Sequence, residues 1–356
     1  MAEPHFFKNI HIENFKSIKS MDLDCGRINL FIGKPNVGKS NILEALSLFC
    51  APYSQNKDQF LSEFIRYDND ISNLFFDRNI QKNIRIESNL GNAYLTLDES
   101  DNNFKFHITQ IELSDSQHQI EYSEIRKENF IKGFHDFYKN ITHKGNVNNK
   151  DQAQVLTSPV RKYIFKIFDE NNKYFFSSLF LKPPFGENLL RLIESNSELR
   201  RNIASLFDEY GLEVLIDIQE NKIIIVKEKD SVLFKIPYAL TADTFQRLIF
   251  HYAAIESNQN SILLFEEPEQ HSYPPYIREL AQTIVDSETN QFFITTHSPY
   301  LFNTIVENCP SEELAIFITF IEDYKTKVKK LTDEELSELL NYGVDIFFNL
   351  NWFVHG

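Results

Sequence analysis

The chain has 356 residues, three widely spaced cysteines and a formal net charge of −15 at neutral pH. Its length predicts one main domain with an inserted lobe. The negative charge argues against strong non-specific binding to nucleic acid, because that affinity comes from neutralising phosphates. The cysteines match neither a metal motif nor a disulfide framework, and neither a signal peptide nor a membrane-spanning stretch is present. We therefore expect a cytoplasmic protein without membrane contact.

The first predicted elements surround a phosphate-binding loop. Residues 27–32 form an apolar run suited to a buried strand, and residues 41–50 carry apolar side chains at helical spacing. Between them lies a complete G-x-x-x-x-G-K-S motif, in which backbone N–H groups surround phosphates at the positive end of a helix. The expected nucleotide-binding residues are Gly33, Lys34, Pro35, Asn36, Val37, Gly38, Lys39, Ser40 and Asn41.

Two residues of this loop have more specific expected roles. Lys39 would reach the β- and γ-phosphates, and the Ser40 hydroxyl would bind Mg²⁺. The sequence therefore predicts that the chain binds ATP and Mg²⁺.

The middle of the chain has a different character. The pattern predicts helices over residues 122–141, 159–168 and 187–210, a polar loop over 142–152 and an antiparallel hairpin within 212–236. We therefore expect an inserted α+β lobe at 101–236 that divides the nucleotide domain into residues 1–100 and 237–356. A charged helix is predicted over 331–340.

A run of acidic residues follows the next predicted strand. Residues 261–265 resemble a central parallel strand, and the strand ends in Glu266-Glu267-Pro268-Glu269. Acidic side chains at the carboxyl end of such a strand face the ligand crevice. We expect Glu266 to hold Mg²⁺ and Glu267 to accept a proton from the attacking water. Taken alone, the run is more typical of a solvated acidic turn, but the phosphate loop favours the catalytic interpretation.

A histidine follows the next strand. Residues 291–296 form another apolar run, and His297 comes directly after it. A neutral imidazole beside the carboxylates could contact the γ-phosphate and the water. A lone histidine after a strand is more often structural, but the order of loop, acidic strand and histidine favours a catalytic role.

This order of motifs resembles that of the ABC-type ATPase heads of the SMC, RecF and OLD group, in particular the stand-alone bacterial ATPases labelled AAA-family. Residues 10–18 (IHIENFKSI) are similar to the I-x-N-F-K-S-I opening of these heads, residues 262–274 to their extended Walker B segment and residues 294–301 to their histidine switch. The resemblance implies an α/β P-loop NTPase fold of the ABC-ATPase type with an N-terminal antiparallel β lobe.

Two departures from the family pattern leave the hydrolysis rate open. Glu266 stands where the family usually has aspartate, and Mg²⁺ demands tight octahedral geometry. The family's signature loop, which in these heads covers the γ-phosphate held by a second protomer, corresponds to residues 240–247. Thr244 replaces its glycine, so close backbone approach is lost. The signature-like residues are Thr241, Ala242, Asp243, Thr244 and Arg247.

The resemblance implies an ATPase that acts as a nucleotide-dependent switch or sensor in phage defence or DNA repair. We expect a homodimer or higher homo-oligomer. We also expect a separate effector protein, a nuclease or toxin, because the 59 residues after His297 are too few for the nuclease domain that larger OLD-family proteins append. Two alternatives stay open: an ATP-bound scaffold with little turnover, and the ATP subunit of a membrane transporter. Candidate DNA contacts, each more typical of a solvated face, are Lys16, Lys19, Arg161, Lys162, Arg200 and Arg201.

Overall fold

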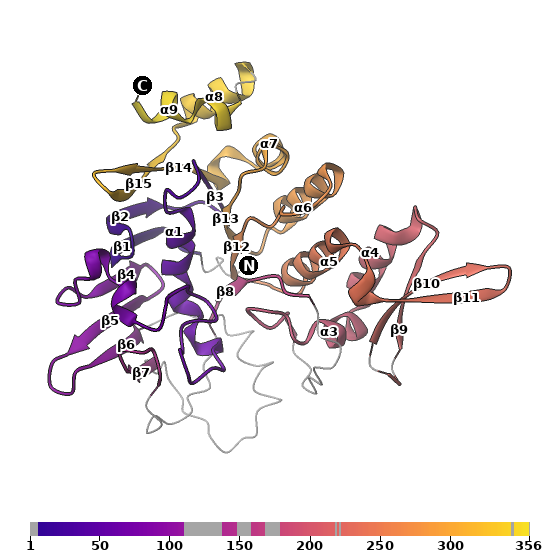
Figure 1. Ribbon diagram of the computed structural model, residues 1–356. Coiled ribbons are helices and arrows are strands. Elements are labelled where there is room, and N and C mark those ends of the chain that lie inside the picture. Colours follow the sequence, from indigo (N-terminus) through magenta and orange to yellow (C-terminus); the bar gives the residue numbers. More distant parts are fainter. Residues whose placement is uncertain are drawn as a thin grey trace.

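The computed structural model describes residues 6–109, 137–147, 158–167, 179–217, 219–220, 222–342 and 345–355. Its core consists of two six-stranded sheets with one helix, α1 (Lys39–Leu46), between them (Figure 1). Further helices cover the opposite face of one of these sheets. The predicted α/β fold is thereby confirmed.

The main sheet carries the nucleotide-site motifs. Its strands, in spatial order, are β15 (Lys325–Lys330), β14 (Leu314–Glu322), β3 (Ile28–Ile32), β13 (Gln291–Thr295), β12 (Ile262–Glu266) and β8 (Val160–Tyr163). The five strands from β14 to β8 are parallel to one another, and the edge strand β15 is antiparallel to β14. Strands β3 and β13 are buried along their whole length, as expected for a parallel sheet that is covered on both faces. The three strands predicted around the motifs are confirmed.

The second sheet is antiparallel and builds the predicted N-terminal β lobe. Its spatial order is β2 (Ile18–Asp24), β1 (Asn9–Phe15), β4 (Ile84–Ser88), β5 (Asn92–Asp98), β6 (Asn103–Thr109) and β7 (Phe137–Ile141). Its apolar face packs on α1, and so does one face of the main sheet. Because side chains alternate along a strand, Phe31 of β3 joins this core and Leu30 joins the core on the opposite face.

Helices cover that opposite face of the main sheet (Figure 1). They are α5 (Asp243–Glu256), α6 (Pro274–Asp286) and α7 (Pro299–Asn308), with α8 (Asp333–Tyr342) and α9 (Ile346–His355) after the last strands. Beside α5 lies a smaller lobe of α3 (Leu189–Ser195), α4 (Ser197–Asp208) and a three-stranded sheet. This sheet has the order β11 (Val232–Pro237), β10 (Lys222–Lys229), β9 (Glu213–Asp217). The helices predicted within 187–210 and 331–340 and the hairpin within 212–236 are thus confirmed.

Two predicted helices are wrong in the described residues. Where the helix over 159–168 was expected, residues 160–163 form strand β8, which extends the main sheet by pairing in parallel with β12. Residues 164–167 belong to no regular element, and residue 168 lies outside the described residues. Of the helix expected over 122–141, residues 137–141 form strand β7, and residues 122–136 lie outside the described residues. In both places pairing with a neighbouring strand outweighs the local pattern. The polar loop expected over 142–152 is a loop as far as residue 147, the last described.

The strand pairing also bears on the division into domains. The expected border at residue 101 falls between the paired strands β5 and β6, and β7 and β8 complete the two large sheets. As a proposal, the inserted lobe is therefore narrower than 101–236 and consists of α3, α4 and β9 to β11. Among the described residues, no helix combines the length and the apolar character needed to cross a membrane.

Candidate functional site

The phosphate loop lies between β3 and α1, where the sequence places it. Gly38 has a φ of 97°, and a Cβ atom there would lie 2.1 Å from the Thr326 hydroxyl oxygen. A Cβ atom on Gly33 would lie 2.3 Å from the Thr319 carbonyl oxygen. Both glycines are therefore required by close packing within the chain.

The Lys39 ammonium folds back over the loop. It donates hydrogen bonds to the carbonyl oxygens of Gly33 at 2.9 Å and Lys34 at 3.0 Å. Lys39 and Ser40 form the first turn of α1, so the helix N-terminus and the ammonium lie at the same loop. This arrangement suits the binding of phosphate groups.

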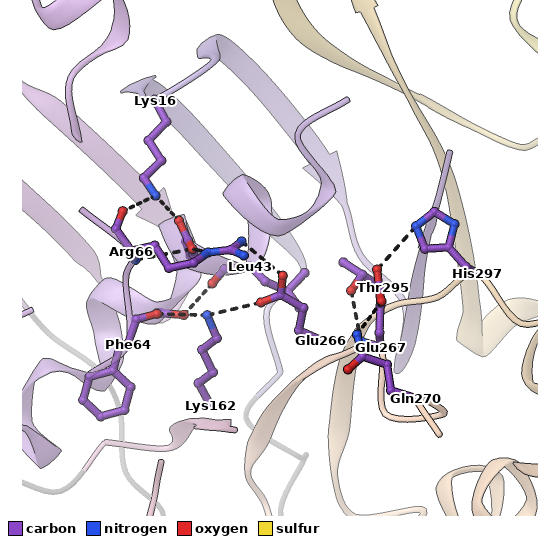
Figure 2. A network of polar contacts seen from close by, with 12 residues as sticks. Lys16, Leu43, Phe64, Arg66, Lys162, Glu266, Glu267, Gln270, Thr295 and His297 are labelled. Atoms are coloured by element: carbon purple, nitrogen blue, oxygen red, sulfur yellow. Dashed lines mark hydrogen bonds and ion pairs between the residues drawn. The ribbon is translucent and has the colours of Figure 1, made fainter. Parts of the chain in front are cut away.

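A carboxylate and an imidazole, the Glu267–His297 pair, lie where β12 and β13 end side by side. Glu266 is paired in register with Thr295, and the backbone N–H of Glu267 donates to the Thr295 carbonyl at 3.0 Å. Glu267 has a φ of 47°, a conformation that is uncommon for a side-chain-bearing residue and concentrated at functional sites. Its Oε1 atom lies 3.4 Å from Nε2 of His297, and its Oε2 atom accepts a hydrogen bond from Gln270 at 2.7 Å (Figure 2).

Lys39 of the phosphate loop and the Glu267–His297 pair affect each other's pKa values. Burial lowers the pKa of Lys39, and the carboxylates of Glu267 and Glu266 oppose this shift. Burial and the positive charge of Lys39 lower the pKa of His297, while Glu267 opposes the shift. The imidazole is therefore favoured in its neutral form at neutral pH, in which it can both donate and accept a hydrogen bond.

Glu266 takes part in a charge network that sequence reasoning missed. Its carboxylate lies 3.2 Å from Nη2 of Arg66 and 3.8 Å from Nζ of Lys162 (Figure 2). Arg66 also donates to the fully buried Glu44 of α1 at 2.7 Å, and Lys16 pairs with the same carboxylate. The one available signal was Glu44, an acidic residue among the apolar positions of a predicted helix.

The expected Mg²⁺ ligands provide oxygen atoms of the right kind. The Ser40 hydroxyl begins α1 and the Glu266 carboxylate ends β12, and both are hard donors that suit Mg²⁺. Arg66 and Lys162 also contact the Glu266 carboxylate, so part of its negative charge is already paired.

The signature-like residues lie at the start of α5 and in the two positions before it. The Thr244 hydroxyl donates to the carbonyl of His271 at 2.7 Å, which ties this helix to the turn after β12. Arg247 pairs with Asp243 at 2.7 Å and stacks over Phe165.

Several basic residues considered for DNA contact are not on the surface. Arg161 and Lys162 are each 2% exposed, so neither the solvated face nor the DNA contact is correct for them. Lys162 donates to the carbonyl of Phe64, and Arg161 pairs with Asn258. Lys16 is turned inward to Glu44, so it too is unsuited to contact DNA.

The chain is similar to known proteins in sequence and in fold. A family model described as "AAA domain, putative AbiEii toxin, Type IV TA system" matches residues 28–303, well over half of the chain. The chain belongs to this AAA-domain family. The solved structure of an SMC head bound to the C-winged helix domain of ScpA is similar to this AAA-family chain at 13% identity and a TM-score of 0.50, covering 93% of this chain and 99% of the other. This similarity shows the fold, that of an SMC head.

Two further relatives are more distant or shorter matches. An SMC head with an extended coiled coil, bound to the C-terminal domain of ScpA from Pyrococcus furiosus, has 13% identity and a TM-score of 0.48, covering 95% of this chain and 99% of that one. An uncharacterized protein of Methanocaldococcus jannaschii is 51% identical over 43 residues. That match spans 12% of the AAA-family chain and only 20% of the length of the relative.

Proposed function

We propose that this AAA-family chain binds and hydrolyses ATP and uses the nucleotide state to control a separate effector protein. The observation that carries the proposal is the pair of Glu267 and His297, 3.4 Å apart and within electrostatic range of Lys39. A carboxylate and a neutral imidazole at the edge of a phosphate loop are suited to orient a water molecule toward a γ-phosphate.

Each residue has a distinct role in the proposed reaction. Lys39 and the loop amides would stabilise the charge that develops on the γ-phosphate, Glu267 would orient the attacking water and accept its proton, and His297 would contact the phosphate. Ser40 and Glu266 would hold Mg²⁺, which when bound neutralises charge on the phosphate oxygens. The sequence carries no signal for which nucleotide base is preferred.

The family description supports the proposed biological role. Its mention of an AbiEii toxin and of toxin–antitoxin systems is compatible with an ATPase that controls a toxin or nuclease in phage defence, with DNA repair as the other setting. The ScpA-bound SMC head supports a partner-binding role for this fold. We further propose a homodimer in which Thr241, Ala242, Asp243, Thr244 and Arg247 of one protomer face the nucleotide of the other.

The switch can be tested by trapping nucleotide states. Glu267→Gln should bind ATP without hydrolysing it, so an affinity-tagged variant purified from its native cells with ATP should retain a protein partner. The same partner should be released with ADP and should be absent from Lys39→Ala, which lacks bound nucleotide. Identical partner occupancy with ATP, with ADP and in Lys39→Ala would contradict nucleotide control.

An ATP-bound scaffold is the second candidate function. It is favoured by the ion pairs that hold Glu266 with Arg66 and Lys162 and by the Thr244 hydroxyl, which is tied to His271 within its own chain. A scaffold needs no catalytic carboxylate, so Glu267→Gln would then leave both turnover and partner binding unchanged.

A further inference from the structure

Glu269 is the last of the three acidic residues in the run that begins at Glu266, the final residue of β12, and the proposed reaction does not use it. Its side chain is buried, with 9% of the residue exposed. Its Oε1 atom accepts hydrogen bonds from the Thr296 hydroxyl at 2.7 Å and from the backbone N–H of His297 at 2.9 Å. Its Oε2 atom is also buried and has no partner among the described residues. A buried carboxyl group with an unpaired oxygen is costly, which calls for an explanation.

These hydrogen bonds connect the two loops of the site. The backbone N–H of Glu267 binds the Thr295 carbonyl, and Glu269 returns to bind His297 two residues further along. Glu267 and His297 are therefore held between two cross-links from the turn after β12 to the loop after β13. The two side chains lie 3.4 Å apart.

The Thr296 hydroxyl extends the connection to the next helix. It donates to Glu269 and accepts from the backbone N–H of Ser298 at 3.0 Å, so its hydrogen atom has a single fixed direction. The Ser298 side chain in turn caps the N-terminus of α7. The loop that carries His297 is thus anchored at one end by Glu269 and at the other by a helix.

The chemistry of the contact requires an acceptor and not a negative charge. Both donors converge on one oxygen, and an amide oxygen offers the same two lone pairs. Burial raises the pKa of Glu269, and the hydrogen bonds from Thr296 and His297 oppose the shift. A neutral side chain of the same shape should therefore serve equally well.

We propose that Glu269 is a positioning residue, whose Oε1 atom holds the loop after β13 so that the His297 imidazole stays beside Glu267. Its effect on turnover rests on the proposed ATP hydrolysis, whereas its effect on the placement of His297 does not.

The placement is tested by NMR of the imidazole signal of His297, assigned with a His297→Gln variant. Glu269→Gln keeps the acceptor oxygen, and the signal should stay where it is in the wild type. Glu269→Leu removes the acceptor, and the signal should move away from its wild-type position. Glu288→Leu, at an exposed glutamate before β13, is the matched control and should change nothing. An unmoved signal in Glu269→Leu would overturn the proposal.

Kinetics test whether the placement matters for the reaction. Glu269→Leu should lower kcat roughly 10- to 100-fold with little change in KM, and Glu269→Gln should keep kcat within about threefold of the wild type. In a His297→Ala background, Glu269→Leu should have almost no further effect, since residues that act through one another are not additive. Additive losses, or equal losses in Glu269→Gln and Glu269→Leu, would refute the positioning role.

The placement of His297 can be decided even if Glu269→Leu does not fold or the wild type does not hydrolyse ATP. If Glu269→Leu does not fold, Glu269→Asp, which withdraws the acceptor by one methylene, takes its place with the same expected shift of the His297 signal. A wild-type chain without turnover would count against the proposed hydrolysis, and the NMR signal would still decide the placement of His297.

Discussion

Glu44 is an unusual residue to find in the middle of a helix between two sheets. Its side chain is fully buried and is paired with Lys16 and Arg66. Burial by itself would raise the pKa of Glu44, but Lys16, Lys162 and the hydrogen bonds from Lys16 and Arg66 hold it below its ordinary value. Through Arg66 the same network reaches Glu266 at the nucleotide site. The charge of Glu44 therefore contributes both to the core and to the position of a proposed metal-site residue.

Neutralising Glu44 should destabilise the fold strongly. Glu44→Gln leaves the mostly buried Lys16 ammonium without its carboxylate partner, whereas the exposed Arg66 keeps its contact with Glu266. The free energy of unfolding should fall by about 3 kcal/mol, as for other broken buried pairs. The control is Asp22→Asn, which removes the exposed partner of His11 and should cost less than about 1 kcal/mol. Urea denaturation at pH 7 measures both changes, and equal losses in the two variants would contradict the account.

The difference in unfolding free energy between the wild type and Glu44→Gln should depend on pH. Because the folded-state pKa of Glu44 is depressed, its stabilising effect is fully present above the unfolded pKa and is lost as pH falls through the folded pKa. The difference in unfolding free energy between wild type and Glu44→Gln should therefore narrow as the pH is lowered below about 4.

At the scale of elements, the phosphate loop is held in place by the N-terminal hairpin and by β15. The Thr326 hydroxyl on β15 donates to the Val37 carbonyl at 2.9 Å and lies 2.6 Å from the Ser17 hydroxyl. Ser17 also accepts a hydrogen bond from Asn41 of α1 at 2.7 Å. Asn14, near the end of β1, and Lys16, in the turn between β1 and β2, have positive φ angles of 58° and 48°. The I-x-N-F-K-S-I opening thus has a structural purpose, which is to support the loop from outside.

Removing the Thr326 hydroxyl should loosen the loop. Thr326→Val loses a hydrogen bond worth about 1 kcal/mol, so the Kd for ATP measured by calorimetry should rise roughly three- to tenfold. Thr319→Val is the matched control, because the buried Thr319 hydroxyl has no partner among the described residues and its loss should not weaken ATP binding. An unchanged Kd in Thr326→Val would show that the support is not needed for binding.

At the scale of the molecule, the two large sheets bring together motifs that are far apart in the sequence. The parallel strands β3, β12 and β13 were predictable because each is a mostly apolar run that is followed by a recognisable motif. Strand β8 was not, since its four residues include Arg161 and Lys162, whose burial depends on partners far away in the chain.

In the candidate site too, the contacts that join residues far apart in the sequence could not be predicted. Glu267 and His297 were predictable from their positions after two strands, and the structure brings them together. The contacts of Arg66 and Lys162 with Glu266 join residues 200 and 104 positions apart, and no local pattern marks either cation. Glu269 was visible as part of an acidic run, but its burial and its two donors from the loop after β13 depend on the tertiary structure.

If Glu267 and Lys39 make this fold a working ATPase, the steady-state ATP hydrolysis rate of the wild type should differ sharply from the rates of Glu267→Gln and Lys39→Ala. We expect measurable turnover in the wild type, a loss of about 100-fold or more in Glu267→Gln with ATP still bound, and loss of both binding and turnover in Lys39→Ala. Equal turnover in the wild type and Glu267→Gln, or a wild type that binds ATP without hydrolysing it, would show that these two residues do not carry out ATP hydrolysis.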